Sequence, residues 1–303
     1  TFGRDDGFHI TPSTGLRLYT SNLWQDYVSP QAGLVLGYDH TNLAFSYARG
    51  VNYPSPVILQ NSLGNKDLPG WLDTKEIKPE VVDHYEVSLT HEQPGLFNAS
   101  ATYFHDKGWD RFRAFMYGRL GAANYTDFFT SSASEYQIDG LELAGSVTPL
   151  DGLEIYGGAT WLWARAKGDD GKTQLKMPYT PSFAFQGGFK YRFLRDFQFS
   201  GDYQHLEGVY SGTSMRTASP AQPASTFSRL TDNDRLNNID VVNLRLDYFF
   251  SYDKLHLEEG RVFAGVDNLF DCKYGYTMEK QGSDHKLYYM PGTTFMAGFE
   301  LKF

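Results

Sequence analysis

The stretch "FAFQGGFKYRF" (residues 183–193) alternates large apolar side chains with polar or small ones along its whole length. One parity carries Phe183, Phe185, Gly187, Phe189, Tyr191 and Phe193. A period of two indicates a β-strand with one apolar and one polar face. The alternation continues in "DFQFSGDYQ" (196–204) and in "DVVNLRLDYFF" (240–250). The sequence therefore predicts an all-β protein whose sheet has two chemically different faces.

Reading the alternation along the chain predicts twelve strands, joined by connections that are alternately short and long. The expected strands are 12–20, 30–38, 41–49, 82–92, 95–108, 134–148, 152–166, 178–193, 196–208, 237–251, 260–270 and 288–303. The expected long connections are 21–29, 50–81, 109–133, 167–177, 209–236 and 271–287. Transmembrane barrels have such short turns on one side and long loops on the other. We therefore expect an antiparallel up-and-down transmembrane barrel.

Two other all-β folds could also explain many strands. A seven-bladed propeller requires about 40–45 residues per blade, which fits a chain of 303 residues. No blade motif repeats in the sequence, however, and several expected strands are longer than propeller strands. A β-sandwich would explain the aromatic residues as core, but it does not explain the alternation of connection lengths. The barrel is the better interpretation.

The composition excludes several classes of function. The net charge of −9 leaves no basic surplus to neutralise phosphates, so we expect no nucleic acid partner. The single cysteine, Cys272, cannot form an internal disulfide or build a zinc site alone. The sequence contains no run of 18 apolar residues, so we expect no transmembrane helix. We expect neither a cofactor nor a metal.

The chain carries no sequence motif of a known catalytic site. HExxH, GxSxG, the Walker A motif and GxGxxG are all absent. His105 and His205 lie near the ends of their expected strands that face the long loops, but no motif places a serine beside either. We therefore expect that the protein is not an enzyme.

The long connections contain the residues that we expect to contact a ligand. They combine arginines with aromatic rings, which suits an anionic, ring-bearing ligand through ion pairing and stacking. The candidates are Tyr53, Trp71, Trp109, Arg111, Arg113, Tyr117, Arg119 and Tyr276. The alternative is that these side chains only pack on one another at the rim.

The C-terminal stretch "MPGTTFMAGFELKF" (290–303) keeps its alternation up to Phe303. In lipid every backbone group must be paired, so a spanning sheet must close and its last strand must be complete. We expect Phe303 to complete the apolar band at the inner rim.

Four stretches of the sequence carry recognisable motifs: "SYARGVNYPSP" (46–56), "IKPEVVDHYEVSL" (77–89), "VFAGVDNLFDCKY" (262–274) and "YYMPGTTFMAGFELKF" (288–303). Together they resemble TonB-dependent outer-membrane receptors of Gram-negative bacteria. The positions that match the family motifs are Arg49, Gly50, Pro54, Lys78, Pro79, Glu80, Tyr85, Glu86, Asn268, Leu269, Phe270, Asp271, Tyr274, Pro291, Gly292 and Phe303. Cys272 and Thr293 depart from the usual family residues.

The resemblance implies a larger assembly than this chain. Barrels of this family have about 22 strands and a plugged lumen, so residues 1–303 are expected to be the C-terminal portion of the barrel. The plug and the first strands would then lie outside this chain. The implied partners are the lipid bilayer, lipopolysaccharide, the N-terminal barrel half with its plug, the TonB complex and the barrel assembly machinery. The implied location is the bacterial outer membrane.

By resemblance, the function is energised uptake of a scarce ligand of the iron-siderophore, haem or cobalamin class. Two alternatives remain open. A stand-alone twelve-stranded porin would be a passive channel. An autotransporter translocator would need a helix before its first strand, and "TFGRDDGFHIT" (1–11) has no helical apolar stripe.

Overall fold

The computed structural model describes residues 1–4, 7–22, 24–54, 78–117, 126–167, 174–177, 179–210, 235–252, 257–281 and 284–302. Within these ranges every regular element is a strand, and no helix has the length and hydropathy needed to cross a membrane. The strands are β1 (Phe2–Gly3), β2 (His9–Tyr19), β3 (Tyr27–Tyr38), β4 (Thr41–Asn52), β5 (Glu80–Gln93), β6 (Phe97–Tyr117), β7 (Thr126–Leu150), β8 (Leu153–Lys167), β9 (Gln174–Leu175), β10 (Phe183–Phe193), β11 (Phe197–Glu207), β12 (Ile239–Tyr252), β13 (Leu257–Asp267), β14 (Thr277–Gln281), β15 (Asp284–Tyr288) and β16 (Thr294–Lys302).

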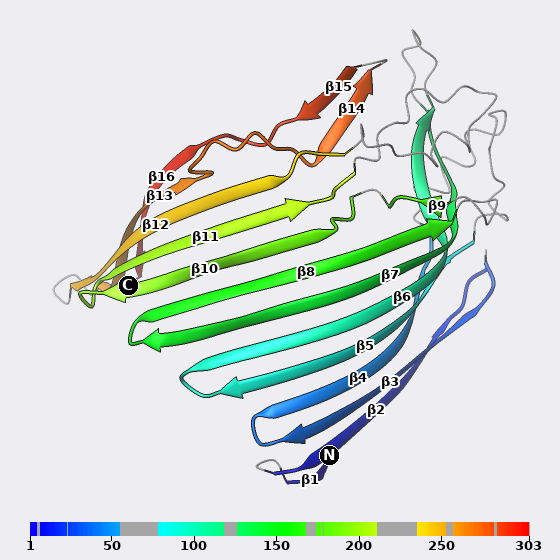
Figure 1. Cartoon of the computed structure of the whole chain (residues 1–303), viewed down its shortest axis with the longest axis horizontal. Coiled ribbons are helices and arrows are strands. Elements are labelled where there is room, and N and C mark those ends of the chain that lie inside the picture. The colour runs from blue at the N-terminus through cyan, green and yellow to red at the C-terminus, as the bar shows by residue number, and fades with distance from the viewer. Residues whose placement is uncertain are drawn as a thin grey trace.

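The long strands form one continuous antiparallel sheet in chain order (Figure 1). Its order is β1-β2-β3-β4-β5-β6-β7-β8-β10-β11-β12-β13-β16, and β9 adds to β8. The twelve predicted strands are all present, which confirms the all-β antiparallel fold. In the described residues β16 does not pair with β1 or β2, so the sheet is an open half-barrel.

The two ends of the sheet differ in the length of their connections. Short turns join β3 to β4, β5 to β6, β7 to β8 and β10 to β11 at one end. Backbone in the left-handed region lets the chain reverse there, as at Gly95 (φ 73°) and Gly152 (φ 81°). The long connections lie at the other end, which we call the rim, and both termini lie at the short-turn end (Figure 1).

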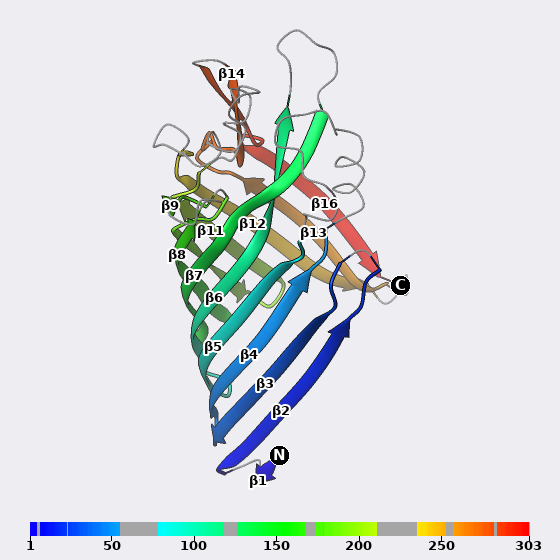
Figure 2. The same cartoon turned by 90° about the vertical axis from the view of Figure 1, so that its right-hand side faces the viewer.

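Two predicted loops are wrong in part. The 109–133 loop is largely strand, because β6 continues to Tyr117 and β7 begins at Thr126, and their tips rise beyond the neighbouring strands (Figure 2). A left-handed residue at Asp110 (φ 55°) and a register shift after Arg111 break the alternation there. The 271–287 loop contains the paired hairpin β14–β15. The strand expected at 178–193 begins only at Phe183.

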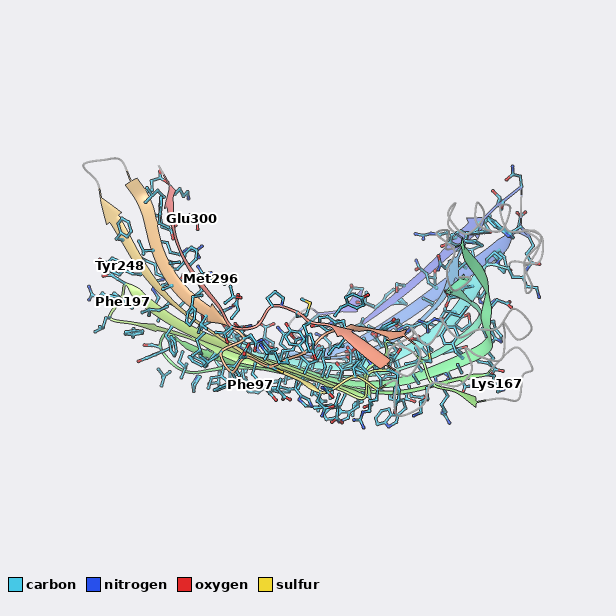
Figure 3. The ribbon with its side chains drawn as sticks, turned by 90° about the horizontal axis from the view of Figure 1, so that it is seen from above. Phe97, Lys167, Phe197, Tyr248, Met296 and Glu300 are labelled. Carbon is cyan, nitrogen blue, oxygen red and sulfur yellow. The ribbon has the colours of Figure 1, made fainter. Side chains whose placement is uncertain are left out.

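The register of the sheet places the apolar parity of every long strand on one face. Phe189 lies opposite Ile155 and Gly201, and Leu143 lies opposite Ala101 and Ala159. This face is convex: Figure 3 shows Phe97, Phe197 and Tyr248 on the outside of the curve, while Met296 and Glu300 lie on the inside. Many convex side chains are exposed, such as Phe295 at 81% and Phe299 at 74%. The convex face is therefore the apolar one and the concave face is the polar one.

Candidate ligand-binding rim

Four aromatic rings gather at the rim end of β2, β3 and β4. The Tyr53 ring centroid lies 5.9 Å from Tyr19, 5.5 Å from Trp24 and 6.2 Å from Tyr27. Tyr19 and Tyr27 are opposite in register and have the concave parity, and Tyr53 follows the end of β4. This cluster includes Tyr53, one of the predicted ligand residues.

The aromatic cluster has a cation and a buried donor beside it. Arg17 Nη1 donates to the Tyr19 hydroxyl at 3.3 Å, and the guanidinium lies 5.9 Å from the Tyr19 ring centroid. Trp24 Nε1 is buried without a hydrogen-bond partner among the described residues. Burial in the cluster raises the pKa of the Tyr53 hydroxyl above its ordinary value, so the ring stays neutral at physiological pH. Neutral rings can stack on a ring-bearing ligand, and the neighbouring guanidinium can form an ion pair with that ligand if it is anionic.

A second concave cluster lies on β5, β6 and β7 around Tyr136. The Tyr136 side chain is 5% exposed, and its hydroxyl donates to Glu80 Oε1 at 2.8 Å. The Arg111 guanidinium lies 5.3 Å from the Tyr136 ring centroid, and its Nη1 lies 3.9 Å from Met177 Sδ. A Cβ on Gly108 would sit 2.1 Å from Tyr136 Cζ, so glycine leaves the space in which the ring lies.

The remaining predicted ligand residues are dispersed. Trp109 lies on β6 with Lys107 Nζ 5.3 Å from its ring, on the convex side of the sheet. Tyr276 stands before β14 with its ring 5.8 Å from Tyr274. Arg113 and Tyr117 occupy β6 opposite Thr130 and Thr126. Trp71, Arg119 and the C-terminal Phe303 lie outside the described residues. A ligand-binding role for any of these residues stays a prediction.

The motif positions near the first long connection make a charged contact between β4 and β5. Arg49 Nε and Nη2 donate to the two carboxylate oxygens of Asp83 at 2.7 and 2.8 Å, and Tyr47 donates to Asp83 at 3.0 Å. The rings of Tyr47 and Tyr85 lie 5.0 Å apart. Pro79 is fully buried, whereas Lys78 and Gly50 are exposed. A bidentate arginine–carboxylate pair fixes the register of these two strands.

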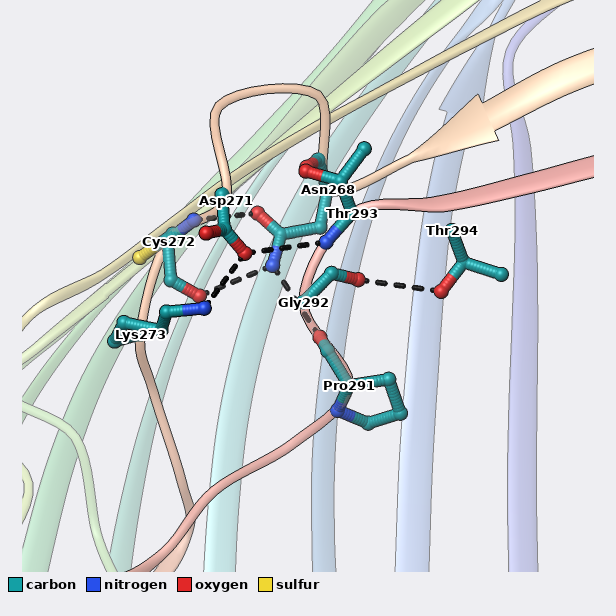
Figure 4. Close-up of polar contacts among 8 residues, drawn as sticks. All are labelled: Asn268, Asp271, Cys272, Lys273, Pro291, Gly292, Thr293 and Thr294. Carbon is teal, nitrogen blue, oxygen red and sulfur yellow. Dashed lines mark hydrogen bonds and ion pairs between the residues drawn. The ribbon is translucent and has the colours of Figure 1, made fainter.

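The last motif positions converge on one turn after β13 (Figure 4). Asn268 is 3% exposed and has a left-handed backbone (φ 51°). Its Nδ2 donates to the carbonyl oxygens of Cys272 (3.0 Å) and Pro291 (3.3 Å), and its Oδ1 accepts from the Cys272 N–H at 2.8 Å. Thr293 Oγ1 donates to the Asn268 carbonyl at 2.8 Å. The side chain of Asn268 therefore ties the end of β13 to the segment that leads into β16.

Electrostatics in this turn follow from the same contacts. The Lys273 ammonium at 2.8 Å and the Thr293 N–H at 3.3 Å lower the pKa of the Asp271 carboxyl. A Cβ on Gly292 would lie 2.3 Å from Asp271 Oδ1, so glycine permits the close approach. Burial, with Tyr276 nearby, raises the pKa of the Tyr274 hydroxyl. Phe270 is 73% exposed and Leu269 bonds through its N–H to Val242.

Sequence reasoning missed several residues that complete these groups. Tyr19, Trp24 and Tyr27 flank the first long connection, and their aromatic density was the available signal. Tyr136 and Asp83 gave no such signal, because their partners Glu80 and Arg49 lie on other strands. In the described part of the chain, no group of three or more His, Cys, Asp or Glu side chains is placed to hold a metal ion.

A family model described as "TonB dependent receptor-like, beta-barrel" matches residues 3–269. The chain belongs to the TonB-dependent receptor family. No protein of curated function matches it in sequence.

Solved structures of a transporter and of two import or siderophore receptors share the fold of this chain. The copper transporter OprC is 19% identical with a TM-score of 0.65, over 92% of this chain and 40% of its own. A mutant (G324V) of the ferric enterobactin receptor PfeA from Pseudomonas aeruginosa is 17% identical with a TM-score of 0.68, over 96% and 42%. The ferric-catecholate import receptor Fiu from K12 E. coli is 16% identical with a TM-score of 0.60, over 91% and 35%. The chain thus spans about two fifths of the length of these receptors.

Proposed function

We propose that this chain forms the C-terminal wall of a TonB-dependent outer-membrane receptor that takes up a scarce ligand. The observation that carries the proposal is the open sheet of twelve long strands with an apolar convex face and a polar concave face. The rim would face the outside of the cell and the short turns would face the periplasm, since outer-membrane barrels have their long loops outside.

The open edges support a barrel completed by further strands. Edge strands expose unpaired N–H and C=O groups, and each costs several kcal/mol in hydrocarbon. β2 and β16 therefore require pairing partners, which the N-terminal half of the receptor would supply. The plug of that half would fill the lumen against the concave face, and TonB would act through the plug. The bilayer and the barrel assembly machinery are the other partners that we infer.

The side chains at the rim suit an anionic ligand that carries aromatic rings. The rings around Tyr53 and the guanidinium of Arg17 lie on the concave side, where a ligand would enter the lumen. We place an iron-siderophore first among the cargo classes because catecholate or hydroxamate complexes are anionic or polar and the first of these carries rings. Haem and cobalamin are the other two classes.

The test is uptake of labelled cargo by cells that express the complete receptor. Ferric siderophores, haem and cobalamin would be supplied to cells with and without TonB. We expect TonB-dependent uptake of one class, reduced by Tyr53→Ala and by Arg17→Ala. Tyr38→Ala is the matched control, because Tyr38 is 67% exposed at the short-turn end of the convex face. Uptake that is independent of TonB would contradict the proposal.

A passive channel is the second candidate, and the size of the assembly decides between them. A denaturing gel with intact mass measurement of material purified from outer membranes would reveal a longer chain or a second one. A plug-bearing partner supports the receptor. A single 34.3 kDa species that resists heat as a barrel and conducts ions would support the channel.

A further inference from the structure

Three side-chain clusters with the same arrangement lie on the convex face, each between two strands that are joined at the rim. In each cluster, a tyrosine and a basic residue two positions further along one strand both contact one aspartate of the next strand. The basic residue lies directly opposite that aspartate in register. We call these clusters the aspartate clamps. They are Tyr47–Arg49–Asp83 on β4 and β5, Tyr103–His105–Asp139 on β6 and β7, and Tyr203–His205–Asp240 on β11 and β12.

The three clamps share one geometry. The tyrosine hydroxyl donates to Oδ1 of the aspartate at 3.0, 2.8 and 2.7 Å, in the order given. Arg49 Nε and the Nδ1 atoms of His105 and His205 lie 2.7, 2.8 and 2.8 Å from the same oxygen of their own aspartate. The recurrence of this contact between three pairs of strands indicates a common role, which is to hold two rim-connected strands together.

The clamps differ in how their charge depends on pH. Arginine stays cationic at every pH that a protein meets, whereas histidine changes its charge between about pH 5 and pH 8. An imidazole can donate a hydrogen bond to a carboxylate in both forms, but the bond from the charged form is the stronger one. The two histidine clamps should therefore weaken as the pH rises through this interval, and the arginine clamp should not.

The clamp on β6 and β7 has a second cation. Arg165 Nη2 of β8 lies 3.3 Å from Asp139 Oδ2. The other ionisable groups beside His105 are Lys107 on its own strand and Tyr85 and Asp83 on β5. Because Arg165 stays charged, Asp139 keeps a cationic partner when His105 becomes neutral.

The clamp on β11 and β12 has no such second cation among the described residues. The His205 side chain is 19% exposed, its Nδ1 contacts Asp240, and its Nε2 lies 3.9 Å from Glu207 Oε2. In the described part of the chain, neither carboxylate forms an ion pair with a lysine or an arginine. On the β10 side, the imidazole faces the uncharged rings of Phe183, at 5.7 Å between centroids, and Phe185. A neutral His205 would therefore leave two carboxylates without a cation beside them.

This clamp lies next to the backbone contacts that join β11 and β12 at their rim ends. Val209 and Leu236 are on the rim side of His205 and Asp240, and the Leu236 N–H donates to the Val209 carbonyl at 2.8 Å. Both side chains are buried against one another in a small apolar cluster. The clamp is therefore placed to hold the Val209–Leu236 contact closed.

We propose that His205 is a proton-dependent positioning residue. When protonated it holds the rim ends of β11 and β12 together, and when neutral it lets the Val209–Leu236 contact open more often. The consequence for cargo rests on the proposed function, because only then do these strand ends border the mouth of the receptor. A rim that opens less often is better preorganised for a ligand, so cargo should bind more tightly at the lower pH.

The test is hydrogen exchange, followed by mass spectrometry, on the complete receptor purified from outer membranes in detergent and free of cargo. Protection of residues 205–210 and 235–240 is compared at about pH 5.5 and about pH 8, after correction for intrinsic exchange rates. The segments beside the arginine clamp, residues 49–54 and 80–83, provide the reference within the same molecule.

We expect protection beside the β11–β12 clamp to be about twofold to fivefold higher at the lower pH, the range that a partly solvated ion pair supplies. Protection beside the arginine clamp should not change. The β6–β7 clamp should respond less than the β11–β12 clamp, because Asp139 keeps Arg165. Equal responses at the β11–β12 clamp and the arginine clamp would overturn the proposal.

Exchanging the basic residues between clamps tests the cause. His205→Arg should make protection beside the β11–β12 clamp independent of pH, and Arg49→His should give the β4–β5 clamp the dependence that it lacks. His91→Arg is the matched control, because His91 bonds to Thr41 at the short-turn end, and it should leave the dependence intact. A pH dependence that survives His205→Arg would show that another group is responsible.

A second variant covers the case in which His205→Arg does not assemble, as judged by heat-modifiable migration on a gel. His205→Gln keeps a neutral hydrogen-bond donor at this position. It should show, at both pH values, the lower protection that the wild type shows at about pH 8. Wild-type behaviour in this variant would contradict the proposal.

Cargo binding is measured separately, with labelled ferric siderophores, haem and cobalamin on cells at the same two pH values. The wild type should bind its cargo more tightly at the lower pH, and His205→Arg should bind it equally at both. A pH-dependent exchange without binding of any cargo would count against the uptake proposal alone. Cargo binding with an exchange that does not depend on pH would count against the clamp alone.

Discussion

The convex and concave faces of the same strands differ in the contacts that their side chains make. On the convex face Leu143, Ala101 and Ala159 form an apolar row, which under the proposed function would face lipid and would need no specific partner. On the concave face some large polar side chains reach across a glycine to a defined partner. Tyr136 crosses Gly108 to reach Glu80, and Tyr156 crosses Gly188 to donate to Asp202.

A substitution on the convex face therefore changes mainly how the protein interacts with its surroundings. A substitution on the concave face changes how neighbouring strands contact one another. A convex side chain interacts mainly with its surroundings, whereas a concave side chain links three neighbouring strands. Removing the glycine between an aromatic ring and its acid should therefore disturb the concave face even though no polar group is lost.

A charge on the convex face should abolish assembly. Phe189→Arg removes the contact of Phe189 with Phe199 (ring centroids 5.4 Å apart) and exposes a cation to lipid. Near the bilayer midplane this costs about 2–4 kcal/mol. Lys190→Ala, its neighbour on the concave face, should assemble normally. Equal yields of heat-modifiable barrel for the two variants would refute the assignment of the faces.

A methyl group beneath Tyr136 should destabilise the concave face. Gly108→Ala forces the ring aside and weakens its bond to Glu80, which together cost about 2–4 kcal/mol. Gly50→Ala is the control, because its nearest neighbour to a new Cβ is the Val82 carbonyl oxygen at 3.9 Å. The measurement is the free energy of unfolding in denaturant with lipid vesicles, and equal values for the two variants would contradict the account.

Replacing a tyrosine by phenylalanine should lower the free energy of unfolding more on the concave face than on the convex face. Tyr156→Phe removes a bond to Asp202 on the concave side, and we expect a loss of about 1–2 kcal/mol. Tyr103→Phe removes a 2.8 Å bond to Asp139 on the convex side, where Asp139 keeps His105 and Arg165 as partners. Its cost should be below about 1 kcal/mol. Denaturant titration of both variants gives the difference, and a larger loss for Tyr103→Phe would reverse the comparison.

The turn after β13 should loosen in acid. The folded pKa of Asp271 is lowered, so its contribution is complete above the unfolded pKa of about 3.9 and is lost as the pH falls through the folded value. We expect faster amide exchange at Thr293, corrected for intrinsic rates, as the pH falls below about 4. Asp271→Asn should remove this dependence. A pH-independent protection in the wild type would show that the carboxylate does not hold the turn.

The alternation of 183–193 and its counterparts predicted the strands and their faces correctly because a sheet with one apolar and one polar face imposes a strict period of two. The prediction failed at 109–133, where β6 and β7 extend beyond the other strands at the rim. The left-handed backbone at Asp110 and the register shift after Arg111 interrupt the alternation there. Only cross-strand pairing, such as Arg113 with Thr130, defines those residues as strand.

The sequence alone predicted the all-β class, the two chemically different faces and the family. The tertiary structure decided which motif residues meet, as when Asn268 binds Cys272 and Pro291, and which aromatic residues join Tyr53. Solvent preference is a property of each residue and leaves a periodic trace in the sequence. Register between strands is a property of pairs that are distant in the chain, and one sequence carries no record of it.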